Sequence, residues 1–118
     1  MTDCLFCRIA RGELPSRKVY EDGDILAFHD IHPAAPVHFM IIPKKHVDSL
    51  MQCTTEDQAV LGKILLLASG LAVEQGLPDG FRTVINTGKG GGQEINHLHV
   101  HVLGGGSPRP ISTLINQK

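Results

Sequence analysis

The sequence has few cysteines, little net charge and no long apolar run, and each shortage excludes a class of protein. Three cysteines in 118 residues are too few for a disulfide framework, which leaves metal binding, redox chemistry or burial as their roles. A formal net charge of −1 creates no basic field that would attract nucleic acid or an anionic membrane. The most apolar stretch, 64 to 73, contains Ser69 and Gly70 and is too short to span a bilayer. We therefore expect small-molecule chemistry, with no nucleic-acid partner and no membrane partner.

The length and the two ends of the chain predict a single domain over residues 1–118. The N-terminus has neither the basic segment nor the apolar segment of a secretory signal, so we expect a cytoplasmic protein. Glycines and prolines follow residue 103 closely, which indicates an irregular tail. We place the folded core at about 4–105 and the tail at 106–118.

The order of predicted elements indicates an α+β fold with a mostly antiparallel sheet of about five strands. A short N-terminal helix is expected over 4–10, and a hairpin over 19–29 turns at Asp22, Gly23 and Asp24. The run 37–42 is apolar except for His38, as in a strand buried on both faces. One long helix is expected over 56–75, with Thr55 and Gln58 as a capping box, and a further strand over 81–85. The apolar stripe of the long helix is wide enough to suggest a subunit interface.

Three histidines alternate with apolar residues near the C-terminal end of the core: His97, His99 and His101. On an extended strand they would share one face at spacings of roughly 6.6 to 7 Å, while Leu98 and Val100 point into the core. Imidazole serves as nucleophile, acid, base or metal ligand near neutral pH. The pattern therefore predicts a chemical function for this face.

A glycine-rich loop over 87–92 leads into the triplet. With almost no side-chain bulk, its backbone can approach a ligand closely and turn N–H groups toward an anion. Lys89 is followed by glycine rather than Ser or Thr, so the loop is not a P-loop. By itself it is either a phosphate cradle or a flexible connection.

The segment from Gly91 to Leu103 resembles the histidine-triad signature, His-x-His-x-His among apolar residues. The segments 28–31, 35–38 and 42–46 resemble the nucleoside phosphoramidase branch, the histidine-triad nucleotide-binding proteins of bacterial type. The likeness covers about 6–105. It implies the histidine-triad fold and the hydrolysis of purine nucleoside 5′-phosphoramidates, such as adenosine 5′-monophosphoramidate, by a homodimer.

The resemblance implies a role for each histidine of the site. His99 would be the nucleophile that forms a nucleotidyl-histidine, with its second nitrogen held by a backbone carbonyl. His101, as an imidazolium, would offset charge on the phosphoryl group or protonate the leaving amine, and His38 would join the same polar network. No cofactor is required for this chemistry.

The resemblance also implies the site for an AMP-like or GMP-like nucleotide. Asp30 would accept hydrogen bonds from the ribose hydroxyls. The base would lie against Phe6, Phe28 and Ile31, and the phosphate would face Asn86, Gly92, Gln93 and the backbone of Glu94. A hydroxyl residue is usual in animal relatives where this chain has Glu94, so the leaving-group preference is left open here.

A second site is suggested by Cys4, Cys7, His46 and His97. Two cysteines two residues apart suit tetrahedral Zn²⁺, and two histidines would complete a closed set of ligands. Some relatives hold zinc at these positions, which implies a structural zinc here. Burial of the cysteines as small apolar side chains is the alternative.

Three other functions compete with the phosphoramidase. A dinucleoside polyphosphate hydrolase would use the same superfamily chemistry. A zinc-dependent hydrolase would place a catalytic metal on the histidine pair. A nucleotide-binding interaction module would keep the site with vestigial activity.

Overall fold

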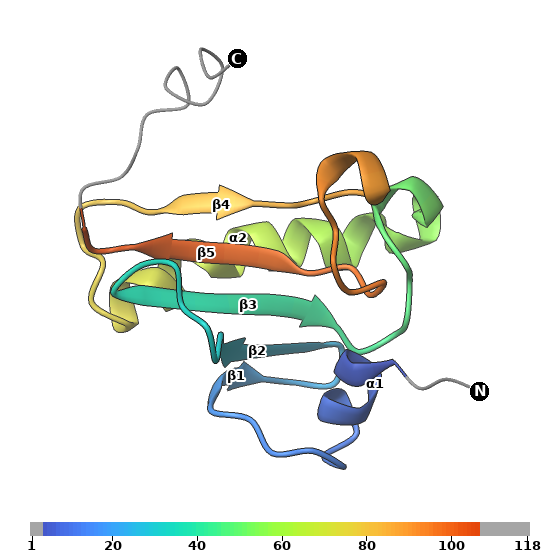
Figure 1. Ribbon diagram of the computed structural model, residues 1–118, viewed down its shortest axis with the longest axis horizontal. Coiled ribbons are helices and arrows are strands. Elements are labelled where there is room, and N and C mark those ends of the chain that lie inside the picture. The colour runs from blue at the N-terminus through green and yellow to red at the C-terminus, as the bar shows by residue number, and fades with distance from the viewer. Residues whose placement is uncertain (1–3, 107–118) are drawn as a thin grey trace.

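The computed structural model describes residues 4–106 of the 118-residue chain. Its elements are a five-stranded sheet, one long helix and one short N-terminal helix (Figure 1). The strands and helices, in chain order, are α1 Leu5–Ala10, β1 Lys18–Glu21, β2 Ile25–His29, β3 Val37–Pro43, α2 Gln58–Glu74, β4 Arg82–Val84 and β5 Val100–Gly104. Short 3₁₀ helices lie at Leu50–Gln52, Thr55–Asp57 and Lys89–Gly91. The predicted tail from residue 107 onward lies outside the described residues.

All neighbouring strands run antiparallel, in the order β1-β2-β3-β5-β4. This confirms the predicted α+β fold and its antiparallel sheet. The β3 and β5 strands pair at the centre, so that Met40 lies opposite His101 and His38 opposite Leu103. Residues far apart in sequence therefore meet at the middle of the sheet.

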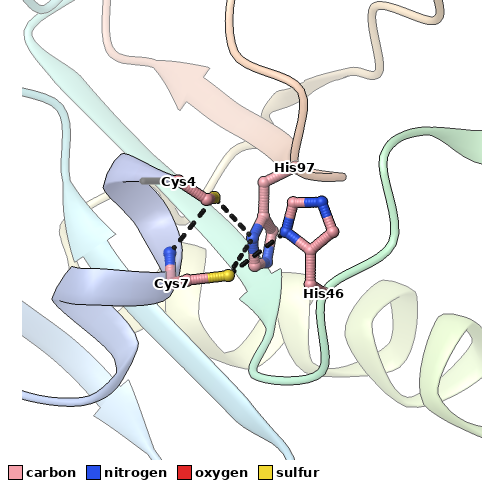
Figure 2. A group of neighbouring side chains, drawn as sticks. All are labelled: Cys4, Cys7, His46 and His97. Carbon is pink, nitrogen blue, oxygen red and sulfur yellow. Dashed lines mark hydrogen bonds between the residues drawn. The ribbon is translucent and has the colours of Figure 1, made fainter. Parts of the chain in front are cut away.

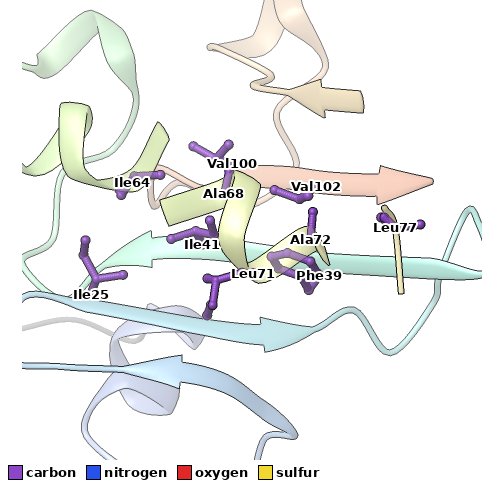
Figure 3. Packing of buried hydrophobic residues seen from close by; sticks show 11 residues of the cluster. Ile25, Phe39, Ile41, Ile64, Ala68, Leu71, Ala72, Leu77, Val100 and Val102 are labelled. Carbon is purple, nitrogen blue, oxygen red and sulfur yellow. The ribbon is translucent and has the colours of Figure 1, made fainter. Parts of the chain in front are cut away.

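The two faces of the sheet bury different clusters. One face packs on α2, which crosses it in Figure 3. The residues of this cluster are Ile25, Ala27, Phe39, Ile41, Val100 and Val102 from the sheet with Ile64, Ala68, Leu71, Ala72 and Leu77 from α2 and the turn after it. The opposite face carries Leu26, Phe28, Met40 and Ile42 with Phe6 of α1. As predicted, β3 is buried on both faces, which explains its continuous apolar run.

The predicted capping box at Thr55 and Gln58 is wrong. Thr54 is the N-cap: its hydroxyl accepts from the Glu56 N–H at 3.2 Å, and Asp57 Oδ2 accepts from the Thr54 N–H at 2.9 Å. Asp57 is also buried and paired with Lys45 Nζ at 3.2 Å. This helical segment therefore begins with a 3₁₀ turn, and regular α-helix starts only at Gln58.

The predicted strand through the whole histidine triplet is also wrong, because β5 begins at Val100. The Leu98 N–H donates to the Val47 carbonyl at 2.8 Å rather than to a neighbouring strand. The alternation of faces nevertheless holds, since Leu98, Val100 and Val102 are all buried. Within residues 4–106, no helix is long and apolar enough to cross a membrane.

Candidate active site and metal centre

A cavity of about 520 Å³ opens on the face of the sheet that does not contact α2. The predicted nucleotide residues line it, with the exception of Gln93. Those that line it are Phe6, Phe28, Asp30, Ile31, Asn86, Gly92, Glu94, His99 and His101. A cavity of this size accommodates a nucleotide.

Several other residues of the cavity were missed by the sequence analysis. Met40, Arg17 and His29 line it, together with His32. Met40 could have been found, because a strand buried on both faces must present alternate residues to the second face. No local signal marks Arg17, which reaches the cavity only because β1 folds beside β2.

The buried His99 has one ring nitrogen fixed and one available. Its Nδ1 lies 2.7 Å from the carbonyl oxygen of His97. A carbonyl can only accept, so Nδ1 carries a proton and donates it, and in the neutral ring the lone pair is therefore on Nε2. The Phe6 ring packs edge-on against the imidazole, with ring centroids 5.2 Å apart. The ring of His99 is thus held in one orientation at a wall of the cavity.

A hydrogen-bonded chain sets the tautomer of His101. The Ala34 N–H donates to His38 Nδ1 at 3.0 Å, so neutral His38 carries its proton on Nε2. That nitrogen lies 2.9 Å from His101 Nδ1 and donates to it. The proton of neutral His101 is therefore on Nε2, the nitrogen that His38 does not occupy.

The pKa of His101 is lowered to about 4, first by burial and then by the neighbouring His99 and His38, while the charge of Asp30 partly offsets these effects. Burial also lowers the pKa of His38, which Asp30 partly offsets. The ligand-free His101 is consequently neutral at pH 7. The predicted imidazolium concerns the substrate complex and stays a prediction.

Asp30 lies beside this chain. Its Oδ1 accepts from the His32 N–H at 2.8 Å, and its Oδ2 lies 3.4 Å from His38 Nε2. Each carboxylate oxygen has further lone pairs. Asp30 can therefore accept hydrogen bonds from a ligand in the cavity.

The two residues that follow the glycine-rich loop, Gln93 and Glu94, differ in whether their N–H groups are available to a ligand. The backbone N–H of Glu94 has no acceptor among residues 4–106, so it is available to an anion. The amide of Gln93 instead bonds to protein groups at both ends. Of these two residues, Glu94 has a backbone N–H that could face a ligand, whereas the Gln93 amide does not.

The four predicted metal ligands come together in the structure (Figure 2). Their donor atoms all lie within 4.8 Å of one another, although α1, the segment after β3 and the segment before β5 supply them. His97 Nδ1 is 3.3 Å from Cys4 Sγ and 3.5 Å from Cys7 Sγ, and His46 Nδ1 is 3.2 Å from Cys7 Sγ. A tetrahedral zinc ion places sulfur and nitrogen ligands about 3.6 Å apart. The observed separations fit that ion.

The histidines of this group also have the hydrogen bonds that zinc ligands need. His97 Nε2 donates to the Pro43 carbonyl at 2.8 Å, and His46 Nε2 lies 2.6 Å from Asp48 Oδ1. Both protons are therefore held on Nε2, and both Nδ1 lone pairs face the sulfurs. The group fits a metal ion of the zinc type.

A second group of possible ligands, formed by Asp30, His38 and His101, does not fit a metal in the same way. His38 Nδ1 accepts a hydrogen bond from a backbone N–H. A metal on its Nε2 would require an imidazolate, which is costly near neutral pH. This group is better described as a hydrogen-bonded chain.

Comparison with known proteins agrees with this arrangement. The model of the HIT domain matches residues 11–107. The chain belongs to the HIT domain family. It is 54% identical over 104 residues to Protein HitA of Neisseria gonorrhoeae, covering 88% of this chain and 97% of that protein.

Solved structures show the same HIT fold. A HIT family hydrolase from Legionella pneumophila superposes with a TM-score of 0.86 at 49% identity, covering 89% of this chain and 95% of that one. A histidine triad protein from Clostridium difficile superposes with a TM-score of 0.89 at 44% identity, covering 93% and 96%. These matches confirm both the predicted family and the predicted fold.

Proposed function

We propose that this HIT protein hydrolyses purine nucleoside 5′-phosphoramidates through a covalent intermediate on His99. The observation that carries the proposal is the hydrogen bond from His99 Nδ1 to the His97 carbonyl, 2.7 Å long, which directs Nε2 of a neutral imidazole to the cavity. The similarity to a protein described as a HIT family hydrolase supports hydrolysis as the reaction class.

In the first step, Nε2 of His99 attacks the α-phosphorus and the P–N bond breaks. The electron pair of that bond stays on the departing nitrogen, which needs a proton. A bound phosphate anion raises the pKa of the adjacent His101, so His101 binds a second proton, on Nδ1, as substrate enters. His38 accepts the new Nδ1–H on its Nε2 after its own proton has moved to Nδ1. His101 then donates the Nε2 proton to the leaving nitrogen and becomes neutral again.

In the second step, water attacks the same phosphorus. His101 Nε2 accepts a proton from that water, and the bond between phosphorus and His99 Nε2 breaks. The products are a nucleoside monophosphate and an amine, and both imidazoles regain their initial state when the proton is released. His38 supports both steps because its Nε2, 2.9 Å from His101 Nδ1, keeps that nitrogen in a hydrogen bond and leaves His101 Nε2 to exchange protons with the leaving group and the water.

The remaining parts of the proposal concern binding. Asp30 binds the ribose hydroxyls, Phe6, Phe28 and Ile31 contact the base, and the Glu94 N–H faces the phosphate. We also propose a structural Zn²⁺ on Cys4, Cys7, His46 and His97, which pins α1 to the segment that carries His99. The cytoplasmic location and the single domain over residues 1–118 stay predictions.

The decisive experiment is intact-mass analysis of acid-quenched protein with an adenosine phosphoramidate. We expect an adduct of one nucleotidyl group, absent from a folded His99→Ala variant that has also lost turnover. Unchanged turnover in His99→Ala overturns the proposal. If the wild-type protein forms no adduct and a chelator abolishes its turnover, the result favours the zinc-dependent hydrolase. Equal rates on a dinucleoside polyphosphate would remove the preference for phosphoramidates, and binding without turnover would indicate an interaction module.

A further inference from the structure

The glycine-rich segment is closed into a loop by one residue, Gln93, through its side chain and its backbone. The Gly88 N–H donates to Gln93 Oε1 at 2.8 Å, and the Gln93 N–H donates back to the Gly88 carbonyl at 3.1 Å. Gly88 has a φ of 68°, a conformation that favours glycine. The two ends of the loop are thus held together by two hydrogen bonds.

The other end of the Gln93 side chain is bonded to two carbonyl oxygens. Its Nε2 donates to Asp48 at 2.6 Å and to Ile95 at 2.9 Å. Asp48 is also the residue whose carboxylate holds His46 Nε2, at 2.6 Å. Gln93 therefore connects the loop to the segment that carries His46.

These bonds leave the side chain unable to bind a phosphate. A primary amide has two N–H donors, and both are used on carbonyl oxygens. Its oxygen could only present lone pairs, which repel an anion. Gln93 is also absent from the residues that line the cavity within the described part of the chain.

We propose that Gln93 is a positioning residue that holds the phosphate-facing loop in its binding conformation without contacting the substrate. The proposal rests on the proposed function, because it assumes that this loop and the Glu94 N–H meet the phosphate. It differs from the role that the family resemblance implies, which places Gln93 against the phosphate itself.

The test compares Gln93→Met, which keeps the length of the side chain and removes its hydrogen bonds, with the wild-type protein. We expect the affinity for adenosine 5′-monophosphate to fall about tenfold, because the side-chain hydrogen bonds that hold the loop are lost. The affinity for adenosine, which has no phosphate, should change less than twofold. In the ligand-free variant, the Gly88 amide hydrogen should exchange at least about tenfold faster by NMR.

Gln75→Met is the matched control, because Gln75 ends α2 on the opposite face of the sheet, and it should change none of these values. Equal losses for adenosine and its monophosphate would indicate general disruption and overturn the proposal. Weaker binding of the monophosphate together with an unchanged exchange rate of the Gly88 amide would indicate that Gln93 contacts the phosphate directly. This result would overturn the proposal as well.

A measurement on the wild-type protein keeps the proposal testable if Gln93→Met does not fold. The Gly88 amide must exchange at least about tenfold more slowly than in an unstructured chain, and unprotected exchange refutes the role. The proposed function fails separately, if the wild-type protein binds the monophosphate but does not cleave a phosphoramidate.

Discussion

His97 Nδ1 faces the two cysteine sulfurs while the carbonyl oxygen of the same residue accepts the Nδ1–H of His99 at 2.7 Å. His97 therefore joins the candidate metal site to the proposed nucleophile. Its ring is fully buried and its Nε2 is bonded to Pro43. Any change that frees the ring should also release the carbonyl that orients His99.

Loss of the metal should destabilise the fold more than it affects the chemistry. We expect a chelator, or Cys4→Ser, to lower Tm by several degrees, since metal binding stabilises only the folded state. Adduct formation on His99 should persist in molecules that stay folded. Cys53→Ser is the control, because Cys53 is not part of the cluster. An unchanged Tm in metal-loaded and metal-free protein would exclude a structural metal.

Acid should destabilise the protein through His101. Its pKa is about 4 in the folded protein, against 6.5 for the unperturbed group, so the unfolded chain binds more protons between these values. Stability then rises with pH from about 4 to 6.5 and is lost on acidification. Thermal melts from pH 7 to 4.5 should show a smaller fall in Tm for His101→Gln than for the wild-type protein. His38, whose pKa is also lowered, keeps part of the slope, and a full wild-type slope in the variant would contradict the assignment.

Asp22 should contribute more to the stability of the fold than the neighbouring Asp24. It accepts from Tyr20 Oη at 2.7 Å, Lys63 Nζ at 2.6 Å and the N–H groups of Asp24 and Ile25 at 2.8 and 2.9 Å. Asp22→Asn should lower the free energy of unfolding in urea by about 1 to 2 kcal/mol. Asp24→Asn is the control and should cost less than about 0.5 kcal/mol, because that carboxylate is 75% exposed and 3.9 Å from Lys63. Similar losses in both variants would show that the Asp22 contacts contribute little.

Glu94 should favour a positively charged leaving group. Its carboxylate is exposed at the cavity, where it can attract a cationic amine. For Glu94→Gln we expect the ratio of kcat/KM for a cationic over a neutral phosphoramidate to fall about fivefold at low salt, and less at high salt. Glu74→Gln, at the end of α2, should leave the ratio unchanged. A ratio that does not respond to Glu94→Gln would limit this residue to its backbone N–H.

The exposed side of α2 should mediate the proposed homodimer. Leu66 and Leu65 are 83% and 51% exposed, and apolar side chains gathered on one face mark an interface. Sedimentation should show a dimer for the wild-type protein and a shift toward monomer for Leu66→Glu. Met51→Glu is the control, since Met51 is 75% exposed outside α2. A monomeric wild-type protein would refute the dimer.

The sequence patterns that predicted the fold are those in which the periodicity of the local backbone decides which side chains are buried. The apolar run of β3 and the alternation of Leu98, Val100 and Val102 determined which side chains enter the core, because burial follows the period of the backbone. The two wrong predictions, the start of α2 and the length of β5, also concern local structure. Hydrogen bonds to Asp57 and to the Val47 carbonyl shifted the start of α2 and shortened β5.

By itself, the sequence determined which residue types were available: three alternating histidines, a Cys-x-x-Cys pair and a glycine-rich loop. Only the tertiary structure decided what each does. It brings Cys4 within 3.3 Å of His97, 93 positions away. It partly buries His101, which lowers the pKa of that side chain, and it places the Gln93 amide on carbonyl oxygens rather than in the cavity. These outcomes depend on desolvation and on contacts between distant segments, and neither is encoded in a local spacing.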